Sequence, residues 1–184
     1  MVEIEIVGNA LCLDLANTVS ARPVAQWDVL ATPDAAVAWS GAVGHPVDDS
    51  PAGDEAELAA IRALRELIYR VFRPVAHGRP PTYDDLDGLA SEYSDAVANG
   101  SLRVVDGTYR LSWPEPRTLR RLRWEVAVSS IDLLTQGPLD RIGECPSCSW
   151  LFLDTSKNGR RRWCSMATCG SRDKARRYYE RHSS

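Results

Sequence analysis

Four cysteines in the C-terminal part of this chain constrain its fold more than any other feature of the sequence. Cys145 and Cys148 form one Cys-x-x-Cys pair, and Cys164 and Cys169 follow after a connector of fifteen residues. Two close thiol pairs on either side of a short connector are typical of a structural zinc site, in which four thiolates surround the metal as a tetrahedron. The spacing therefore predicts one structural Zn²⁺ bound by Cys145, Cys148, Cys164 and Cys169.

A redox role is the main alternative for these cysteines. A thioredoxin-like Cys-x-x-Cys motif needs a strand before it and a helix after it, inside a βαβ unit. Here the motif at 145–148 follows the end of a predicted helix and precedes a predicted hairpin. A regulatory variant, in which oxidation of the thiolates ejects the zinc, stays open as a second interpretation.

The first 140 residues are predicted to form a mainly helical domain with one small β-hairpin. Residues 55–76 make the clearest amphipathic helix, because apolar side chains recur every three or four positions. Residues 102–113 alternate around Asp106-Gly107, which is typical of a hairpin. Further helices are predicted at 8–20, from 32 to 41 or 44, at 82–98 and at 116–136.

Residues 141–184 are predicted to form a separate small domain, with the boundary near residues 137–141. We expect residues 150–153 and 161–164 to pair as a second hairpin around the Asn158-Gly159 turn, followed by a helix over 171–182. Such a layout resembles a treble clef or zinc ribbon, which is too small to fold without its metal. The predicted fold class of the whole chain is therefore α+β.

Charge is divided unevenly along the sequence. Residues 155–184 hold nine Lys or Arg against two acids, a net charge of +7, whereas residues 1–154 carry −10, so that the chain total is −3. A basic segment fixed by a metal site suits an acidic polymer, because guanidinium groups grip phosphates and pair with guanine edges. The predicted DNA-binding residues are Arg160, Arg161, Arg162, Arg172, Lys174, Arg176, Arg177 and Arg181.

These cations could also serve the protein without any nucleic acid. Cations stabilise the thiolates of a zinc site, and Asp173 and Glu180 can pair with arginines of the predicted terminal helix. The basic helix could also dock an acidic protein surface, including the acidic body of this chain. A structural zinc module for protein interaction is therefore the alternative function.

Several classes of protein are disfavoured by the sequence. It has no apolar run of about 18 residues, so no membrane-spanning helix is expected, and acidic residues stand where a signal peptide would carry cations. We expect a cytoplasmic protein. Four thiolates leave a metal closed to substrate, and the sequence shows neither a nucleophile paired with a base nor a phosphate-binding glycine loop, so we do not expect an enzyme.

Asp14 and Asn17 are the polar residues that stand out upstream. They interrupt a predicted helix that otherwise carries leucines, so they are candidates for binding a small ligand. The alternative is that both side chains hydrogen-bond nearby backbone, as such residues commonly do. Cys12 in the same helix is expected to be a small buried hydrophobe.

The C-terminal motifs resemble a known family. The segment from Arg161 to Tyr178, together with Cys145-x-x-Cys148 and Leu151-Phe-Leu-Asp154, is similar to the CGNR zinc finger over residues 141–182. The family's Asn after Cys-Gly is Ser171 here; serine can still cap a helix. The resemblance implies that the four cysteines bind zinc and that the finger binds double-stranded DNA.

The N-terminal part resembles the ABATE domain, which is associated with stress-induced transcription regulation. The matching residues are Leu13-Asp14-x-x-Asn17-Thr18 and Leu64-Arg65-Glu66, and the likeness covers most of residues 1–140. The resemblance implies a zinc-finger transcription regulator whose N-terminal domain responds to stress, to a small ligand or to a protein. A lone finger reads sequence weakly, so we also expect a homodimer.

Overall fold

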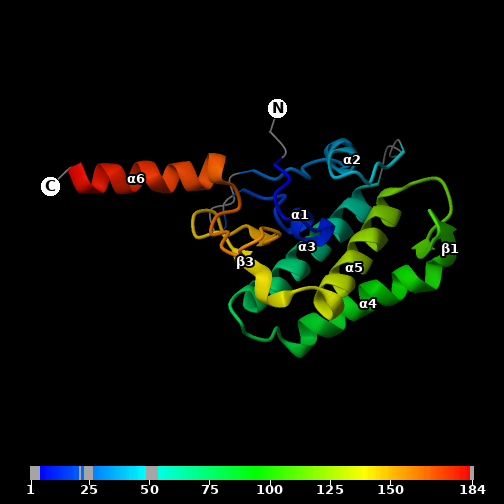
Figure 1. The fold of residues 1–184 in the computed structure, drawn as a ribbon. Coiled ribbons are helices and arrows are strands. Elements are labelled where there is room, and N and C mark those ends of the chain that lie inside the picture. Colours follow the sequence, from blue (N-terminus) through cyan, green and yellow to red (C-terminus); the bar gives the residue numbers. More distant parts are fainter. Residues whose placement is uncertain (1–4, 21, 23–26, 49–53, 183–184) are drawn as a thin grey trace.

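Helices dominate the N-terminal part of the computed structural model, which describes residues 5–20, 22, 27–48 and 54–182 (Figure 1). The helices of this part are α1 (Leu11–Ala16), α2 (Pro33–Ala42), α3 (Glu55–Ala76), α4 (Tyr83–Asn99) and α5 (Leu119–Gln136). Three of them begin at a threonine, Thr32, Thr82 or Thr118, whose side chain accepts the backbone N–H of the third residue after it. Each cap satisfies an amide that would otherwise lack a partner, which explains why these helices start where they do.

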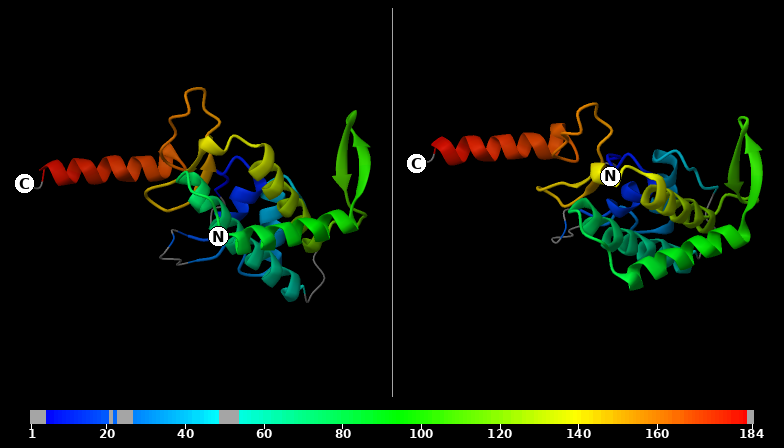
Figure 2. Two further views of the ribbon diagram at one scale, coloured as in Figure 1. Left: turned by 90° about the horizontal axis from the view of Figure 1, so that it is seen from below. Right: turned by 60° about the horizontal axis from the view of Figure 1, so that its bottom comes forward.

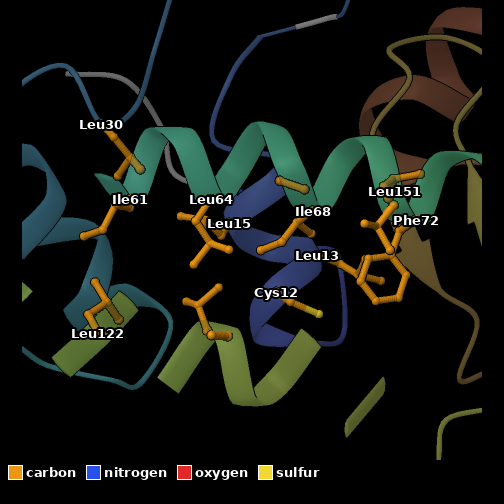
Figure 3. Packing of buried hydrophobic residues seen from close by; sticks show 14 of the residues in the cluster. Cys12, Leu13, Leu15, Leu30, Ile61, Leu64, Ile68, Phe72, Leu122 and Leu151 are labelled. Carbon is orange, nitrogen blue, oxygen red and sulfur yellow. The ribbon is translucent and has the colours of Figure 1, made fainter. Parts of the chain in front are cut away.

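The main hydrophobic core lies around α3. The short helix α1 packs against both α3 and α5, and α4 packs against the same two helices. Leu64, Ile68 and Phe72 of α3 are buried there against Leu13 and Leu15 of α1, as Figure 3 shows. The apolar stripe predicted for 55–76 is therefore the face on which the domain is assembled.

A two-stranded hairpin stands at the end of the molecule opposite the C-terminal helix (Figures 1 and 2). It consists of β1 (Ser101–Val105) and β2 (Thr108–Ser112), paired antiparallel from Ser101↔Ser112 to Val105↔Thr108. Asp106 and Gly107 both have positive φ, 49° and 75°, as a tight turn of this kind requires. The predicted hairpin is confirmed.

The cysteine region follows α5. It contains a short 3₁₀ turn η1 (Leu139–Arg141), the strands β3 (Ile142–Glu144) and β4 (Leu151–Leu153), a π-helical turn η2 (Met166–Gly170) and the helix α6 (Ser171–His182). The α+β fold class and the terminal helix predicted at 171–182 are confirmed. Figure 2 shows α6 projecting from the rest of the molecule.

The second hairpin differs from the prediction, which paired residues 150–153 with 161–164. Strand β4 pairs with β3 instead, in the register Ile142↔Leu153, Gly143↔Phe152 and Glu144↔Leu151, and residues 161–164 form no strand. The physical reason is that the other edge of β4 is already occupied. The backbone N–H of Leu153 donates to the carbonyl of Gly8, and the side chain of Asn17 holds both main-chain groups of Leu151.

The β3–β4 hairpin shares the core of the helical part. Ile142 and Leu151 are 5% and 0% exposed and belong to the same buried cluster as α1 and α3. In Figure 3 Leu151 lies beside Phe72 of α3. The cysteine region is thus seated on the helical body by its own strands.

Candidate metal centre and basic surface

Four thiols converge at the base of α6. The ligand atoms of Cys145, Cys148, Cys164 and Cys169 all lie within 4.8 Å of one another. The Sγ atoms of Cys148 and Cys164 are 3.5 Å apart, as are those of Cys164 and Cys169. Zn–S bonds of about 2.3 Å in a tetrahedron place the sulfurs roughly 3.8 Å apart, so the group already has the size of a zinc site.

Local backbone geometry brings the two pairs together. Cys145 and Cys148 lie in the turn between β3 and β4. Two hydrogen bonds close this turn: the backbone N–H of Cys145 donates to the carbonyl of Trp150, and the backbone N–H of Ser149 donates to the carbonyl of Cys145. Cys169 lies in η2. The side chain of Ser165 caps the start of this turn by accepting the backbone N–H of Thr168. One tight turn therefore places Cys145 and Cys148, and a second one places Cys169.

The chemistry of the donor set suits a cation. None of the four cysteines is in a disulfide. Hydrogen bonds from the Cys148 and Cys164 thiols hold the pKa of Cys145 far below its usual range, and contact with Cys145 raises the pKa of Cys164. Four packed sulfurs can all be thiolates only around a positive charge, so these cysteines are the ligand set of one structural Zn²⁺. The ion would cross-link the two cysteine pairs. With four thiolates bound, it would have no ligand position left for a substrate.

Arg161 is not placed like the other predicted DNA-binding residues. Its guanidinium donates to the carbonyl of Val7 at 2.7 Å and to the carbonyls of Trp163 and Cys164, and it lies 4.4 Å from the centroid of the Phe152 ring. These contacts fasten the segment that carries the second cysteine pair to the N-terminal segment. We infer that Arg161 holds the finger in place, a role that its position within an Arg-rich run could not reveal.

Asp154 is a second structural residue that sequence reasoning missed. It is 4% exposed, and its carboxylate accepts the backbone N–H groups of Ser156 and Arg161 at 2.8 Å each. It thereby shapes the connector between the two cysteine pairs. Its place directly after the apolar Leu-Phe-Leu strand is the signal that could have marked it.

The remaining predicted cations gather around Trp163, which lines three adjoining clefts. The first cleft includes Arg160 and Arg162, together with Arg161 and with Lys157, which was not among the predicted residues. The second includes Arg162, Arg172 and Arg176, and the third includes Lys174, Arg177 and Arg181. The structure therefore brings together residues from the connector and from α6. Whether they contact DNA stays a prediction.

Ion pairing divides these cations into two groups. Asp173, on the first turn of α6, bonds Arg176 and Arg177 at 2.7 Å each, and its side chain is only 10% exposed. Across residues 5–20, 22, 27–48 and 54–182, no ion pair with a carboxylate forms at Arg160, Arg162, Arg172, Lys174 or Arg181. None of residues 171–182 is buried, so their cations are presented to solvent. This second group is free to meet a partner.

Asp14 and Asn17 are both buried and hydrogen-bonded to backbone. Asp14 Oδ1 accepts the N–H groups of Val7 and Gly8 at 3.0 and 2.7 Å. Burial raises the pKa of Asp14, although these bonds act to lower it. Asn17 Nδ2 donates to the carbonyl of Leu151 at 2.8 Å, and Asn17 Oδ1 accepts the Leu151 N–H at 2.9 Å. These contacts match the backbone-bonding alternative, and ligand binding by Asp14 and Asn17 stays a prediction.

Further bonds join the cysteine region to the first twenty-odd residues. Trp150 Nε1 donates to the carbonyl of Val19 at 2.7 Å, and the Arg22 N–H donates to the carbonyl of Cys148 at 3.2 Å. Cys12 is fully buried as expected, and burial raises the pKa of its thiol to about 12. The residues around α1 thus connect the helical body to the metal centre.

Comparison with known proteins agrees with this architecture. A model of the ABATE family, described as "Putative stress-induced transcription regulator", matches residues 9–137. A model of the CGNR zinc finger matches residues 141–182. No curated protein matches the chain. Neither family is an enzyme family by its description, and none of the described helices is long and apolar enough to cross a membrane.

Proposed function

Because this chain belongs to the ABATE family and carries a CGNR zinc finger, we propose that it is a DNA-binding transcription regulator whose finger contacts duplex DNA. In this proposal residues 1–140 form a regulatory domain that responds to stress, to a small ligand or to a protein. Residues 141–184 form the finger. The protein acts in the cytoplasm, as a homodimer.

The observation that carries the proposal is the placement of unpaired cations on one rigid element. Arg172, Lys174 and Arg181 lie on α6, which projects from the zinc site and buries none of its residues. A helix of this width enters the major groove of B-DNA, where arginine can bond phosphates and guanine edges. Arg162 of the connector lines the second cleft together with Arg172, and Arg160 lines the first cleft beside it, so the basic surface extends beyond the helix.

The experiment is a fluorescence-anisotropy titration of labelled random-sequence duplex DNA with the zinc-loaded full chain at several salt concentrations. We expect binding that weakens steeply as salt rises, because each phosphate contact releases counterions. Chelation of zinc should abolish it. Absence of binding by fully zinc-loaded protein at about 50 mM salt would contradict the proposal. If the protein binds, selection of bound fragments from random duplexes would identify the preferred sequence.

A protein partner is the second candidate, and one observation favours it. Residues 1–154 carry a net charge of −10 against +7 for residues 155–184, so the basic helix of one copy could dock on the acidic body of another. The measurement is sedimentation of the zinc-loaded chain at low and high salt, without DNA. Salt-sensitive self-association that duplex DNA does not disrupt would favour this function over the first.

A further inference from the structure

The second of the three clefts is built by all the segments that hold the zinc ligands. Ser147 lies between Cys145 and Cys148, Trp163 directly precedes Cys164, and Arg172 follows Cys169 by three residues. The walls of this cleft therefore come from the Cys145–Cys148 turn, which we call the zinc knuckle, from the connector and from the first turn of α6. Since zinc joins these segments, the metal sets the width of the cleft.

The cleft is electropositive and has few free acceptors. Arg162 and Arg172 line it without forming an ion pair to any carboxylate of the described residues. The guanidinium of Arg162 lies over the Trp163 ring, 5.0 Å from its centroid, which restricts its orientation. Arg176 adds a third cation whose direction is set by its 2.7 Å contact with Asp173.

Asp173 is the one carboxylate in the lining, and its charge is already engaged. Its Oδ1 atom bonds Arg176 and its Oδ2 atom bonds Arg177, and only a tenth of the side chain is exposed. Arg162, Arg172 and Arg176 against Asp173 give the lining a net charge of +2, which attracts an anion. Guanidinium groups only donate hydrogen bonds, so the preferred occupant is a group made of acceptors.

A backbone phosphate meets these requirements better than a base edge does. A phosphodiester offers charged oxygens to two guanidinium forks and to the Ser147 hydroxyl, whereas base edges in the groove present donors as well as acceptors. The spacing of the other unpaired cations along α6 also suits a helix that lies in the major groove with Arg172 on the phosphate backbone. Arg181 lies nine residues beyond Arg172, about 14 Å along the helix, which is comparable to the width of the major groove of about 12 Å.

We propose that the cleft between the zinc knuckle and the first turn of α6 seats one phosphate of the nucleic-acid backbone, gripped jointly by Arg162 and Arg172. This inference rests on the proposed function, that the finger binds duplex DNA. It assigns these two arginines to positioning the finger on the backbone and leaves base contacts to residues further along α6. It also makes the seat dependent on zinc, because the metal joins its walls.

The test measures the salt dependence of duplex binding for four full-length, zinc-loaded proteins: the unmodified chain, Arg162→Gln, Arg172→Gln and the double variant. The logarithm of the binding constant falls with the logarithm of salt by about 0.9 for each phosphate neutralised. If both arginines hold one phosphate, each single variant changes the slope by less than about 0.9, and the double variant lowers it by about 0.9 in total. Affinity of the double variant at about 0.1 M salt should fall by about eightfold, and equally on two unrelated sequences.

The matched control is Arg79→Gln, an exposed arginine in the loop between α3 and α4 that lines a different cleft. Zinc content and helical circular dichroism of every variant should equal those of the unmodified chain. A double variant whose slope and affinity match the Arg79→Gln control overturns the phosphate seat while leaving DNA binding intact. If the double variant lowers the salt slope by about 1.8, the two arginines bind two separate phosphates, and the proposal of one shared phosphate is wrong. A sequence-dependent loss of affinity overturns it in favour of base contacts, and failure of the unmodified chain to bind removes both proposals.

Discussion

Replacing Asn17 with alanine tests whether the helical body and the metal centre unfold together. The Asn17 side chain is 3% exposed, and its amide forms two hydrogen bonds with the backbone of Leu151, 134 residues away. Asn17→Ala removes both bonds and leaves a buried N–H and a buried carbonyl without partners. Each such group costs about 1–3 kcal/mol, so we expect a loss of about 2–6 kcal/mol in the free energy of unfolding.

The assay follows two signals in one thermal scan of the zinc-loaded protein. Far-ultraviolet circular dichroism reports the helices, and a chromogenic chelator reports released zinc. A domain of this size loses about 2–4 °C in Tm per kcal/mol, so both transitions should move down together by about 4–24 °C. The control is Asn99→Ala at the end of α4, because the Asn99 amide also bonds backbone, the Asp95 carbonyl, but is exposed. We expect that control to stay within about 0.5 kcal/mol of the unmodified chain.

Two results would refute the reasoning. One is an Asn17→Ala protein whose Tm matches that of Asn99→Ala, since the buried amide would then carry no stability. The other is zinc release that shifts while the helical transition does not. That outcome would show that the finger opens without disturbing α1 and α3.

Three further predictions rest on the same kinds of contact. Chelation of zinc should lower the Tm of the helical signal itself, because Ile142 and Leu151 belong to the core of the body; a helical transition unchanged by chelator would contradict this. Arg161→Gln should cost about 2–4 kcal/mol in urea unfolding and speed zinc loss, whereas the adjacent exposed Arg160→Gln should change neither. Burial alone would raise the pKa of Glu125, but hydrogen bonds from His45 and Arg121 hold it below the usual 4.5. Glu125 therefore stabilises the fold at neutral pH and loses that contribution as pH falls below 4.5, so urea unfolding of Glu125→Gln from neutral to acidic pH should show a flatter acid limb.

The metal site and the helices could be predicted from the sequence because each is specified by residues that lie close together in the chain. Two thiol pairs at this spacing satisfy the tetrahedral requirement of zinc whatever surrounds them. Residues 55–76 carry a complete apolar stripe, and Thr82 stands at the start of α4 as its cap, so both elements could be read from neighbouring residues. For the same reason the turn at Asp106-Gly107 was predictable.

The partner of β4 was not predictable by these means. Strands of three residues carry almost no information on register, and an Asn-Gly turn at 158–159 suggested the wrong partner. Gly8 and Asn17 instead cover the free edge of β4. The packing of α1 against α3 brings these two residues to that edge. Likewise the role of Arg161 depends on the carbonyl of Val7, 154 residues earlier. Contacts that join such distant segments leave no periodic pattern in the sequence.

The contact between Asn17 and Leu151 also decides how freely the two halves can be exchanged in evolution or by recombination. Asn17 recognises the main chain at position 151, so its two hydrogen bonds do not depend on which apolar side chain a donor finger carries there. That side chain must still fill the buried core position of Leu151. The recognising residue has no equivalent freedom: aspartate lacks the donating NH₂ group, and glutamine is longer by one methylene. A grafted C-terminal half can therefore vary at the strand within the limits of core packing, while the acceptor protein must keep an asparagine at the end of its first helix.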